Sequence, residues 1–188
     1  VLIDGVDVRD YSLYHLREGV GMVLQKNVLF SGSIADNLRW GDENADDETV
    51  RAAAKLAQAD GFVTSFPDGY QTDLVEGGTN VSGGQKQRLC IARALLKKPK
   101  ILIFDDSTSA VDTATEAQIR TAFRTSLSDA TKIIIAQRIT SVMDADLIVV
   151  MDEGGIVGTG THTSLLQNNE TYREIYDSQM EQRQEVRA

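Results

Sequence analysis

The segment at residues 81–85, VSGGQ, carries the strongest chemical signal in the sequence. Its S-x-x-Q spacing predicts a helix that Ser82 caps, with Gln85 at the third helical position returning a hydrogen bond to the cap. Gly83 and Gly84 lie between them and let the backbone come close to a ligand. Because a helix start presents N–H groups and the positive end of the dipole, the segment predicts an anion site made of backbone.

Two carboxylates, Asp105 and Asp106, follow the apolar run 101–104 further along the chain. Carboxylates at the end of a buried strand can hold a hard cation beside a reacting phosphate, and Asp105 suits a magnesium ligand that binds through water. The pair could instead only cap the loop before the next helix, and VSGGQ could be an ordinary helix start. Finding both segments in one chain favours a phosphate site.

Apolar runs and helical patterns alternate along the chain and must position these residues. Strands are predicted at 19–24, 101–104, 133–136 and 147–151, and the last three are typical of strands buried on both faces of a parallel sheet. Helices are predicted at 47–59, from Ser82 to Pro99, at 115–127 and at 172–183. The alternation predicts an α/β fold with a mostly parallel sheet and ligands at the carboxyl ends of its strands.

The composition narrows the class of protein. With 188 residues, 41% of them hydrophobic, the chain suits one well-cored domain. Its formal charge of −9 argues against a nucleic-acid partner, since phosphate backbones are held mainly by clustered Lys and Arg. The single cysteine, Cys90, cannot form an internal disulfide and fits a reducing, cytosolic setting. No apolar run of about 18 residues occurs, so a membrane-spanning part would lie elsewhere.

VSGGQ resembles the signature motif of ATP-binding-cassette (ABC) proteins, and ILIFDD at 101–106 resembles their Walker B strand, in the family's order and at its usual separation. The resemblance covers almost the whole chain. It implies a single ABC ATPase domain of the P-loop NTPase-like α/β fold, with ATP and Mg²⁺ as ligands. Residues of about 35–95 would form a helical subdomain with the signature, and 1–34 and 96–188 the core α/β subdomain.

The resemblance also implies roles for individual residues. Gln25 matches the Q-loop glutamine, which reaches the magnesium ion and senses nucleotide, and Asp105 matches the magnesium-binding aspartate. In the family each nucleotide site is shared, and the signature of one subunit completes the site of the other. The residues expected to contact nucleotide or the opposite subunit in this way are Ser82, Gly83, Gly84 and Gln85 of the signature, and Ser109 and Asp112 of the D-loop SAVD.

Two further segments resemble exporters rather than importers. Residues 28–40, VLFSGSIADNLRW, match the segment that touches the coupling helices of the membrane part, and Glu76 matches a glutamate-and-glycine loop that also faces the membrane domain. The resemblance therefore implies a multidrug-type exporter, with this domain at the cytoplasmic face of the cell membrane. Its own transmembrane domain would be one partner, and the transported substrate cannot be inferred from this chain.

Two positions depart from the family pattern. Asp106 stands where glutamate usually polarises the attacking water, and its side chain is one methylene shorter, so it should be a poor general base. Gln137 stands where histidine is usual, and it supplies no positive charge to the transition state. This double change resembles the degenerate-site half of a heterodimeric exporter. We therefore expect a different half-transporter as partner, whose competent site this chain's signature completes.

No G-x-x-x-x-G-K-[ST] motif occurs in the sequence, although the family places such a phosphate-binding loop upstream of this region. The opening VLIDGVDV reads as a strand and turn inside a sheet, so we expect a truncated domain without its Walker A segment. Alone, such a chain should neither bind ATP tightly nor hydrolyse it. The loss of a central strand should also expose apolar surface through which copies could associate.

Two other functions remain open. A chromosome-maintenance or DNA-repair ATPase would share the signature and Walker B motifs, but it should show long heptad insertions and a basic surface, which this sequence lacks. A regulatory cassette that binds nucleotide without hydrolysis is favoured by Asp106 and Gln137. Comparing the turnover of a homodimer with that of a mixed pair would separate this reading from an active motor.

Overall fold

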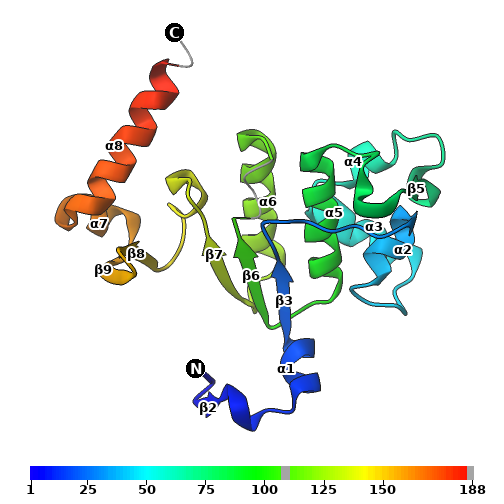
Figure 1. Ribbon diagram of the computed structural model, residues 1–188, viewed down its shortest axis with the longest axis horizontal. Coiled ribbons are helices and arrows are strands. Elements are labelled where there is room, and N and C mark those ends of the chain that lie inside the picture. The colour runs from blue at the N-terminus through cyan, green and yellow to red at the C-terminus, as the bar shows by residue number, and fades with distance from the viewer. Residues whose placement is uncertain (107–110, 186–188) are drawn as a thin grey trace. The chain divides into compact units, whose positions relative to one another are not determined.

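The computed structural model describes residues 1–106 and 111–185, and within 182–185 the backbone only. The chain divides into two compact units, Val1–Ile135 and Ala136–Ala188, which are taken in turn. Figure 1 shows the order of helices and strands within each. In the described part of the chain, no helix combines the length and the apolar character that a membrane crossing requires.

The first unit is built on a three-stranded parallel sheet, in the order β3 (Val20–Val23), β6 (Ile101–Asp105) and β7 (Thr131–Ile135). Met22 pairs with Ile103, and Ile103 pairs with Ile133. These strands arise from the apolar runs in the sequence, and their parallel pairing with intervening helices confirms the expected α/β fold.

One face of this sheet is covered by helices. Phe104 of β6 stacks on Phe123 with ring centroids 4.7 Å apart, and Leu102 and Val23 are buried beside it. The helices of the first unit are α1 (Leu13–Gly19), α2 (Ile34–Arg39), α3 (Asp47–Leu56), α4 (Asp60–Val63), α5 (Gly83–Leu96) and α6 (Thr113–Ser126). Because α5 and α6 supply Leu89, Ile119 and Phe123 to the same apolar cluster, this face forms the core.

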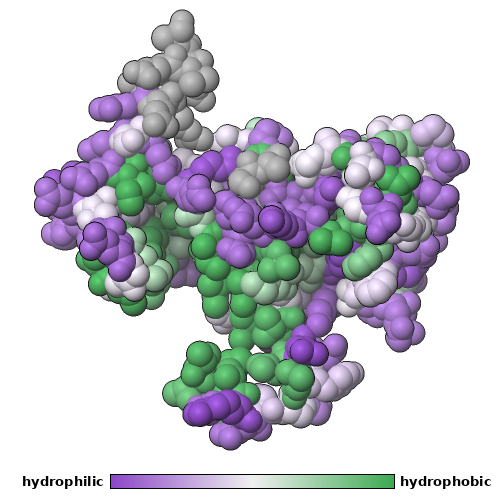
Figure 2. Space-filling model, in the orientation of Figure 1, coloured by the Kyte–Doolittle hydropathy of each residue, from purple (hydrophilic) through white to green (hydrophobic). Residues whose placement is uncertain are grey.

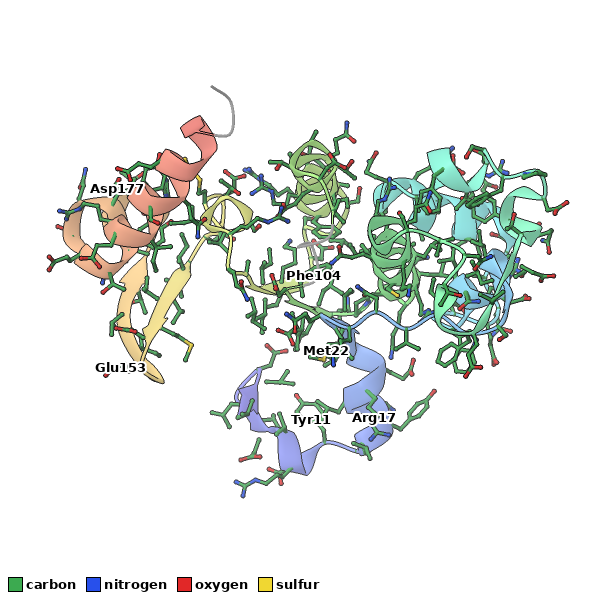
Figure 3. All side chains as sticks on the ribbon, turned by 45° about the horizontal axis from the view of Figure 1, so that its top comes forward. Tyr11, Arg17, Met22, Phe104, Glu153 and Asp177 are labelled. Atoms are coloured by element: carbon green, nitrogen blue, oxygen red, sulfur yellow. The ribbon has the colours of Figure 1, made fainter. Side chains whose placement is uncertain are left out.

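The opposite face of the sheet is open, so the expectation of strands buried on both faces is wrong for β6 and β7. Met22 of β3 is 51% exposed, and Ile133 and Ile135 of β7 are 45% and 50% exposed. Figure 2 shows hydrophobic residues at the surface in the region of the sheet. Figure 3 shows Met22 and Phe104 on opposite sides of the strands. Alternate side chains of a strand point to opposite faces, and only one face meets helices here. The expected exposure of apolar surface is confirmed, and association through it remains a prediction.

Short paired strands complete the first unit. The predicted opening strand and turn form a hairpin of β1 (Leu2–Ile3) and β2 (Val6–Asp7), which turns at Asp4 and Gly5, both with positive φ. A second pair, β4 (Gly32–Ser33) and β5 (Asp73–Leu74), runs antiparallel. Single turns of 3₁₀ helix lie at Val8–Asp10, Gly69–Gln71 and Glu76–Gly78. Helices α2 to α5 fall in the predicted helical subdomain, whose boundaries stay a prediction.

The second unit contains an antiparallel hairpin and two helices. Strands β8 (Ile148–Asp152) and β9 (Gly155–Gly160) pair with each other, so the expectation that 147–151 forms a buried parallel strand is wrong. Ile148 and Val150 of β8 are buried and the residues next to them are exposed, so only one face of this strand is covered. The 3₁₀ turn Ile139–Ser141 and helices α7 (His162–Asn168) and α8 (Glu170–Glu185) supply the rest of the small core.

Candidate functional site

The predicted helix start at Ser82 is present, and it is capped as the sequence indicates. Ser82 Oγ accepts a hydrogen bond from Gln85 N at 3.2 Å, and Gln85 Oε1 accepts one from Ser82 N at 2.9 Å, which completes the capping box. Ser82 and Gly83 are exposed. Because the first turn of a helix presents N–H groups without intrahelical partners, this end of α5 is open to an anion.

The body of α5 is fixed by packing and by an arginine on its inner side. Leu89 and Ala92 are fully buried in the core. Arg88 Nη1 donates a hydrogen bond to Gln58 O at 2.7 Å, and its guanidinium lies 4.7 Å from the centroid of the Phe62 ring. Burial lowers the pKa of Arg88. These contacts hold the capped end of α5 on a rigid element rather than on a free loop.

Two predicted catalytic residues meet at the carboxyl end of the sheet. Gln25 lies just beyond β3, and its Nε2 donates a hydrogen bond to Asp106 Oδ2 at 3.3 Å. Parallel strands in register end at the same edge of a sheet, so residues 81 positions apart in sequence become neighbours here. The structure thus brings together Gln25 and Asp106, which the resemblance matches to the Q-loop glutamine and to the residue after the Walker B aspartate.

The backbone of Asp106 is held in an uncommon conformation. Its φ is 43°, in the left-handed region that residues other than glycine rarely adopt, although aspartate tolerates it better than most. Asp106 N donates a hydrogen bond to Ile135 O at 2.8 Å, so the neighbouring strand β7 fixes this position. Asp105 pairs with Ile135 in the ladder and is therefore on the open face of the sheet.

Two of the remaining predicted site residues, Gln137 and Asp112, have hydrogen-bond partners of their own. Gln137 belongs to the second unit, where its carbonyl accepts a hydrogen bond from Gln179 Nε2 at 2.8 Å. Asp112 is the N-cap of α6 and accepts a hydrogen bond from Thr115 N at 2.9 Å, which holds the pKa of its carboxyl below the usual value. Ser109 lies outside the described residues. The functional roles of all these residues stay predictions.

An exposed cluster formed by Val28, Phe30 and Trp40, here called the aromatic surface, follows Gln25 in the chain. Trp40 is 69% exposed and Phe30 41%, and their rings stack with centroids 4.6 Å apart. They border a groove of about 290 Å³ between β3 and α5 that Cys90, Arg93 and Lys97 also line. Exposed aromatic rings beside a groove are typical of a protein contact.

The aromatic surface is joined to the loop that contains Glu76. Gly77 N donates a hydrogen bond to Leu29 O at 3.1 Å, and Gly32 of β4 pairs with Leu74 of β5. Gly77 and Gly78 both have positive φ, which explains the glycine pair after Glu76. The structure therefore brings together the two segments in which the sequence resembles exporters.

Sequence reasoning missed two residues beneath the aromatic surface, Arg93 and Asn37. Asn37 is only 1% exposed, and Arg93 Nε donates a hydrogen bond to Asn37 O at 2.8 Å. A signal was available, because Arg93 follows Leu89 by one helical turn and so is in phase with the apolar side of α5. A charged residue in that phase indicates a buried side chain with specific partners.

Comparison with known proteins gives consistent matches. A family model described as "ABC transporter" matches residues 1–109. An uncharacterised ABC transporter ATP-binding protein of Mycobacterium tuberculosis is 47% identical over 182 residues, which cover 95% of this chain and 31% of that protein. Heavy metal tolerance factor 1 of Caenorhabditis elegans is 42% identical over 177 residues, which cover 94% of this chain and 22% of that protein.

Among solved structures, that of a bacterial Atm1-family ABC exporter with ATP bound superposes with a TM-score of 0.90 at 41% sequence identity. The match covers 95% of this chain and 31% of that one. The chain thus spans about a third of the length of this exporter and of the mycobacterial relative, and less of the nematode one. The two folds agree over nearly all of this chain.

Proposed function

This chain belongs to the ABC transporter family, and on that premise we propose that it is the nucleotide-binding domain of an exporter that couples ATP binding and hydrolysis to transport. The observation that carries the proposal is the capped, exposed start of α5 at Ser82, with two glycines in its first turn. That end suits the terminal phosphate of a nucleotide, because backbone N–H groups and the helix dipole both favour negative charge.

The chemistry of the polar residues fits Mg²⁺ and ATP. Asp105, Asp106 and Gln25 offer hard oxygen ligands at the carboxyl end of the sheet, where α/β folds bind ligands. No group of three or more His, Cys, Asp or Glu gathers among the described residues. Mg²⁺ binds through one or two carboxylates plus substrate phosphates, and Asp105 and Asp106 supply two carboxylates. The ion would neutralise phosphate charge, and Asp105 and Gln25 would hold it.

We assign different roles to the start of α5 and to the carboxyl end of the sheet. The start of α5 completes the hydrolysing site of a second, different half-transporter. Asp106 and Gln137 leave this chain's own site weakly reactive, because the shorter carboxylate reaches its water poorly and glutamine brings no positive charge. The left-handed backbone of Asp106 and its bond to Gln25 support this, since both restrict where the short side chain can reach.

The partner on the membrane side is the exporter's transmembrane domain, which would place this chain at the cytoplasmic face of a membrane. We propose that the aromatic surface, with the adjoining Glu76 loop, receives it. Support comes from the exposed, stacked rings of Phe30 and Trp40 beside a groove and from the bond that joins the two segments. Exposed apolar patches are uncommon on surfaces that contact only water, and aromatic residues are enriched at protein interfaces.

A cross-link tests the assignment of α5. Gly83→Cys, in a Cys90→Ala background of the full-length protein paired with its partner, is exposed to an ATP analogue that carries a thiol-reactive group on its terminal phosphate. Labelling should require the closed, nucleotide-bound pair. Thr161→Cys, at the exposed N-cap of α7, is the matched control and should remain unlabelled. Absence of labelling at position 83 in every closed pair would overturn the proposal.

A non-hydrolytic regulatory cassette is the second candidate, and Asp106 in place of glutamate is the observation that favours it. Such a cassette would bind nucleotide only to hold a dimer together. ATP turnover of the homodimer and of the mixed pair separates the two functions. An exporter motor requires turnover in the mixed pair, whereas a regulatory cassette shows none in either.

A further inference from the structure

A partly buried polar contact between Arg93 of α5 and Asn37 of α2, here called the Arg93–Asn37 bracket, lies beneath the aromatic surface. Arg93 Nε donates a hydrogen bond to Asn37 O at 2.8 Å, and Arg93 Nη2 donates one to Asn37 Oδ1 at 3.0 Å. Asn37 is almost fully buried. Buried polar side chains are stable only when their partners are in place, so this contact specifies one arrangement of α2 on α5.

Asn37 fixes the segment 28–33, which carries Val28 and Phe30 of the aromatic surface. Its Oδ1 accepts a hydrogen bond from Phe30 N at 2.9 Å, and its Nδ2 donates to Phe30 O at 2.9 Å. The same Nδ2 donates to Ser33 O at 3.1 Å. One side-chain amide thus satisfies both backbone groups of Phe30, as a neighbouring strand would. The position of the Phe30 ring therefore depends on Asn37.

Arg93 holds the same segment from the other side. Its Nη1 donates a hydrogen bond to Val28 O at 3.0 Å, and its guanidinium lies 5.6 Å from the centroid of the Phe30 ring. Burial lowers the pKa of this guanidinium. Removing a charged group from water costs free energy, which several hydrogen bonds can offset. The planar guanidinium of Arg93 donates to three acceptors at once, two on Asn37 and one on Val28.

The bracket joins parts of the molecule that have separate expected roles. The segment 28–33 follows Gln25, which contacts Asp106, and it carries Val28 and Phe30 of the aromatic surface. Arg93 lies on the same continuous helix as the capped start at Ser82. A rigid helix moves as one body, so a displacement of its start is transmitted to Arg93 and to the carbonyl and ring that Arg93 holds.

We propose that Arg93 and Asn37 are positioning residues that carry nucleotide-dependent movement of α5 to the surface that meets the membrane domain. This inference rests on the proposed function. It goes further by naming the side chains through which the nucleotide end and the membrane end are coupled. A merely structural role is the competing explanation, and the chain contains a residue that separates the two.

Arg88 is the matched control. It lies on α5 as Arg93 does, is half-buried, donates to a backbone carbonyl and lies over an aromatic ring. Its partners are the carbonyls of Gln58 and Gly84 and the ring of Phe62, none of which is part of the aromatic surface. Lysine keeps the charge at either position but cannot form the arginine fork. Arg88→Lys and Arg93→Lys therefore remove similar contacts at different places.

The only cysteine in the chain, Cys90, reports directly on the bracket. Its thiol donates a hydrogen bond to Val28 O at 3.7 Å, and it lines the groove beside Arg93. A maleimide should react with it mainly when the segment 28–30 opens. We expect Arg93→Lys to raise the labelling rate of the 188-residue chain about tenfold, and Arg88→Lys to leave it within about twofold.

Equal labelling rates in the wild type, Arg93→Lys and Arg88→Lys would overturn the bracket. Thermal melting shows whether each variant is folded. Should Arg93→Lys not fold, Phe30→Leu replaces it, because this exposed ring can be removed without opening the core. Phe30→Leu should raise the rate about threefold by removing the ring over Arg93, and an unchanged rate would equally overturn the proposal.

Transport by the reconstituted full-length protein and its partner tests the consequence. In Arg93→Lys we expect substrate moved per ATP hydrolysed to fall about fivefold or more, while ATP hydrolysis itself stays within about twofold. Arg88→Lys should keep the wild-type ratio. An unchanged ratio in Arg93→Lys overturns the coupling role. If the wild-type pair neither hydrolyses nor transports, the proposed function fails, and Cys90 labelling still decides whether the bracket holds the surface.

Discussion

The start of α5 and the carboxyl end of the parallel sheet are the two regions of the first unit to which the resemblance assigns nucleotide chemistry, and they differ in kind. At α5 the segment VSGGQ resembles the family signature, and both hydrogen bonds of the capping box form. At the sheet, Asp106 replaces the usual glutamate, has a left-handed backbone and is bonded to Gln25.

The two parts of the proposed nucleotide site therefore depend on different features: the start of α5 on backbone N–H groups, and the end of the sheet on how far a side chain reaches. The anion site that we propose at α5 would be made of backbone N–H groups, so it should persist wherever the helix and its cap persist. The general-base chemistry that we propose at the sheet would depend on one carboxylate reaching a water within hydrogen-bond distance, so a side chain shorter by one methylene should weaken it. A heterodimer could keep the first part and lose the second.

The largest effect is expected from Ser82→Arg. A bulky cation at the cap removes the capping box and fills the space an anion would occupy, so ATP turnover of the paired full-length protein should fall about 100-fold or more. Turnover is measured by phosphate release. Thr161→Arg, at the N-cap of α7, is the matched control and should keep turnover within about twofold. A loss of less than about threefold in Ser82→Arg would contradict the asymmetry.

The second effect is a gain. Restoring the usual residues with Asp106→Glu and Gln137→His should raise turnover in this chain's own site about tenfold, because a longer carboxylate and a cationic imidazole both favour hydrolysis. The measurement uses a pair whose other site is silenced, so that only this site contributes. Asp106→Asn serves as control, since asparagine can still accept from Gln25, and it should change turnover by less than about threefold. A large loss in Asp106→Asn would mean that the sheet end is already active.

The third effect is on stability and contrasts the same two regions. Ser82→Ala removes the acceptor for Gln85 N and should lower the free energy of unfolding by about 1 kcal/mol in urea. Ser82→Asn keeps a capping acceptor and should restore most of it. Gln25→Ala removes one long, exposed hydrogen bond and should cost less than about 0.5 kcal/mol. A larger cost for Gln25→Ala than for Ser82→Ala would reverse the comparison.

The sequence predicts best what short-range spacing encodes. Ser82 and Gln85 are three residues apart, so their hydrogen bonds follow from local chain geometry, and the capping box was predictable. The apolar runs likewise predict β3, β6 and β7 and their parallel pairing. Which face of a strand is covered depends on residues far away, so the exposure of Met22 and Ile135 was not predictable from the runs themselves.

Long-range polar contacts were also beyond the sequence. The bond between Gln25 and Asp106 needs β3 and β6 to be paired in register, and the Arg93–Asn37 bracket needs α2 to lie on α5. The antiparallel pairing of β8 with β9 could not be predicted either, because an apolar run does not show which strand it pairs with. The roles of Gln137 and Ser109 remain predictions from the resemblance.

The smallest effect concerns Asp112, which caps α6 as Ser82 caps α5, except that its cap can be titrated. The bond from Thr115 N to the carboxylate lowers the pKa of Asp112 below its unfolded value of about 3.9. The stabilising effect of the carboxylate is therefore fully present above the unfolded pKa and is lost as the pH falls through the folded pKa.

Asp112→Asn keeps a capping acceptor without a charge. Thermal melting from about pH 6 to about pH 2.5 should show the wild type slightly more stable at the upper end, with the difference vanishing toward the lower end. A difference in melting temperature that stays constant over this range would show that the carboxylate does not stabilise α6 through its charge.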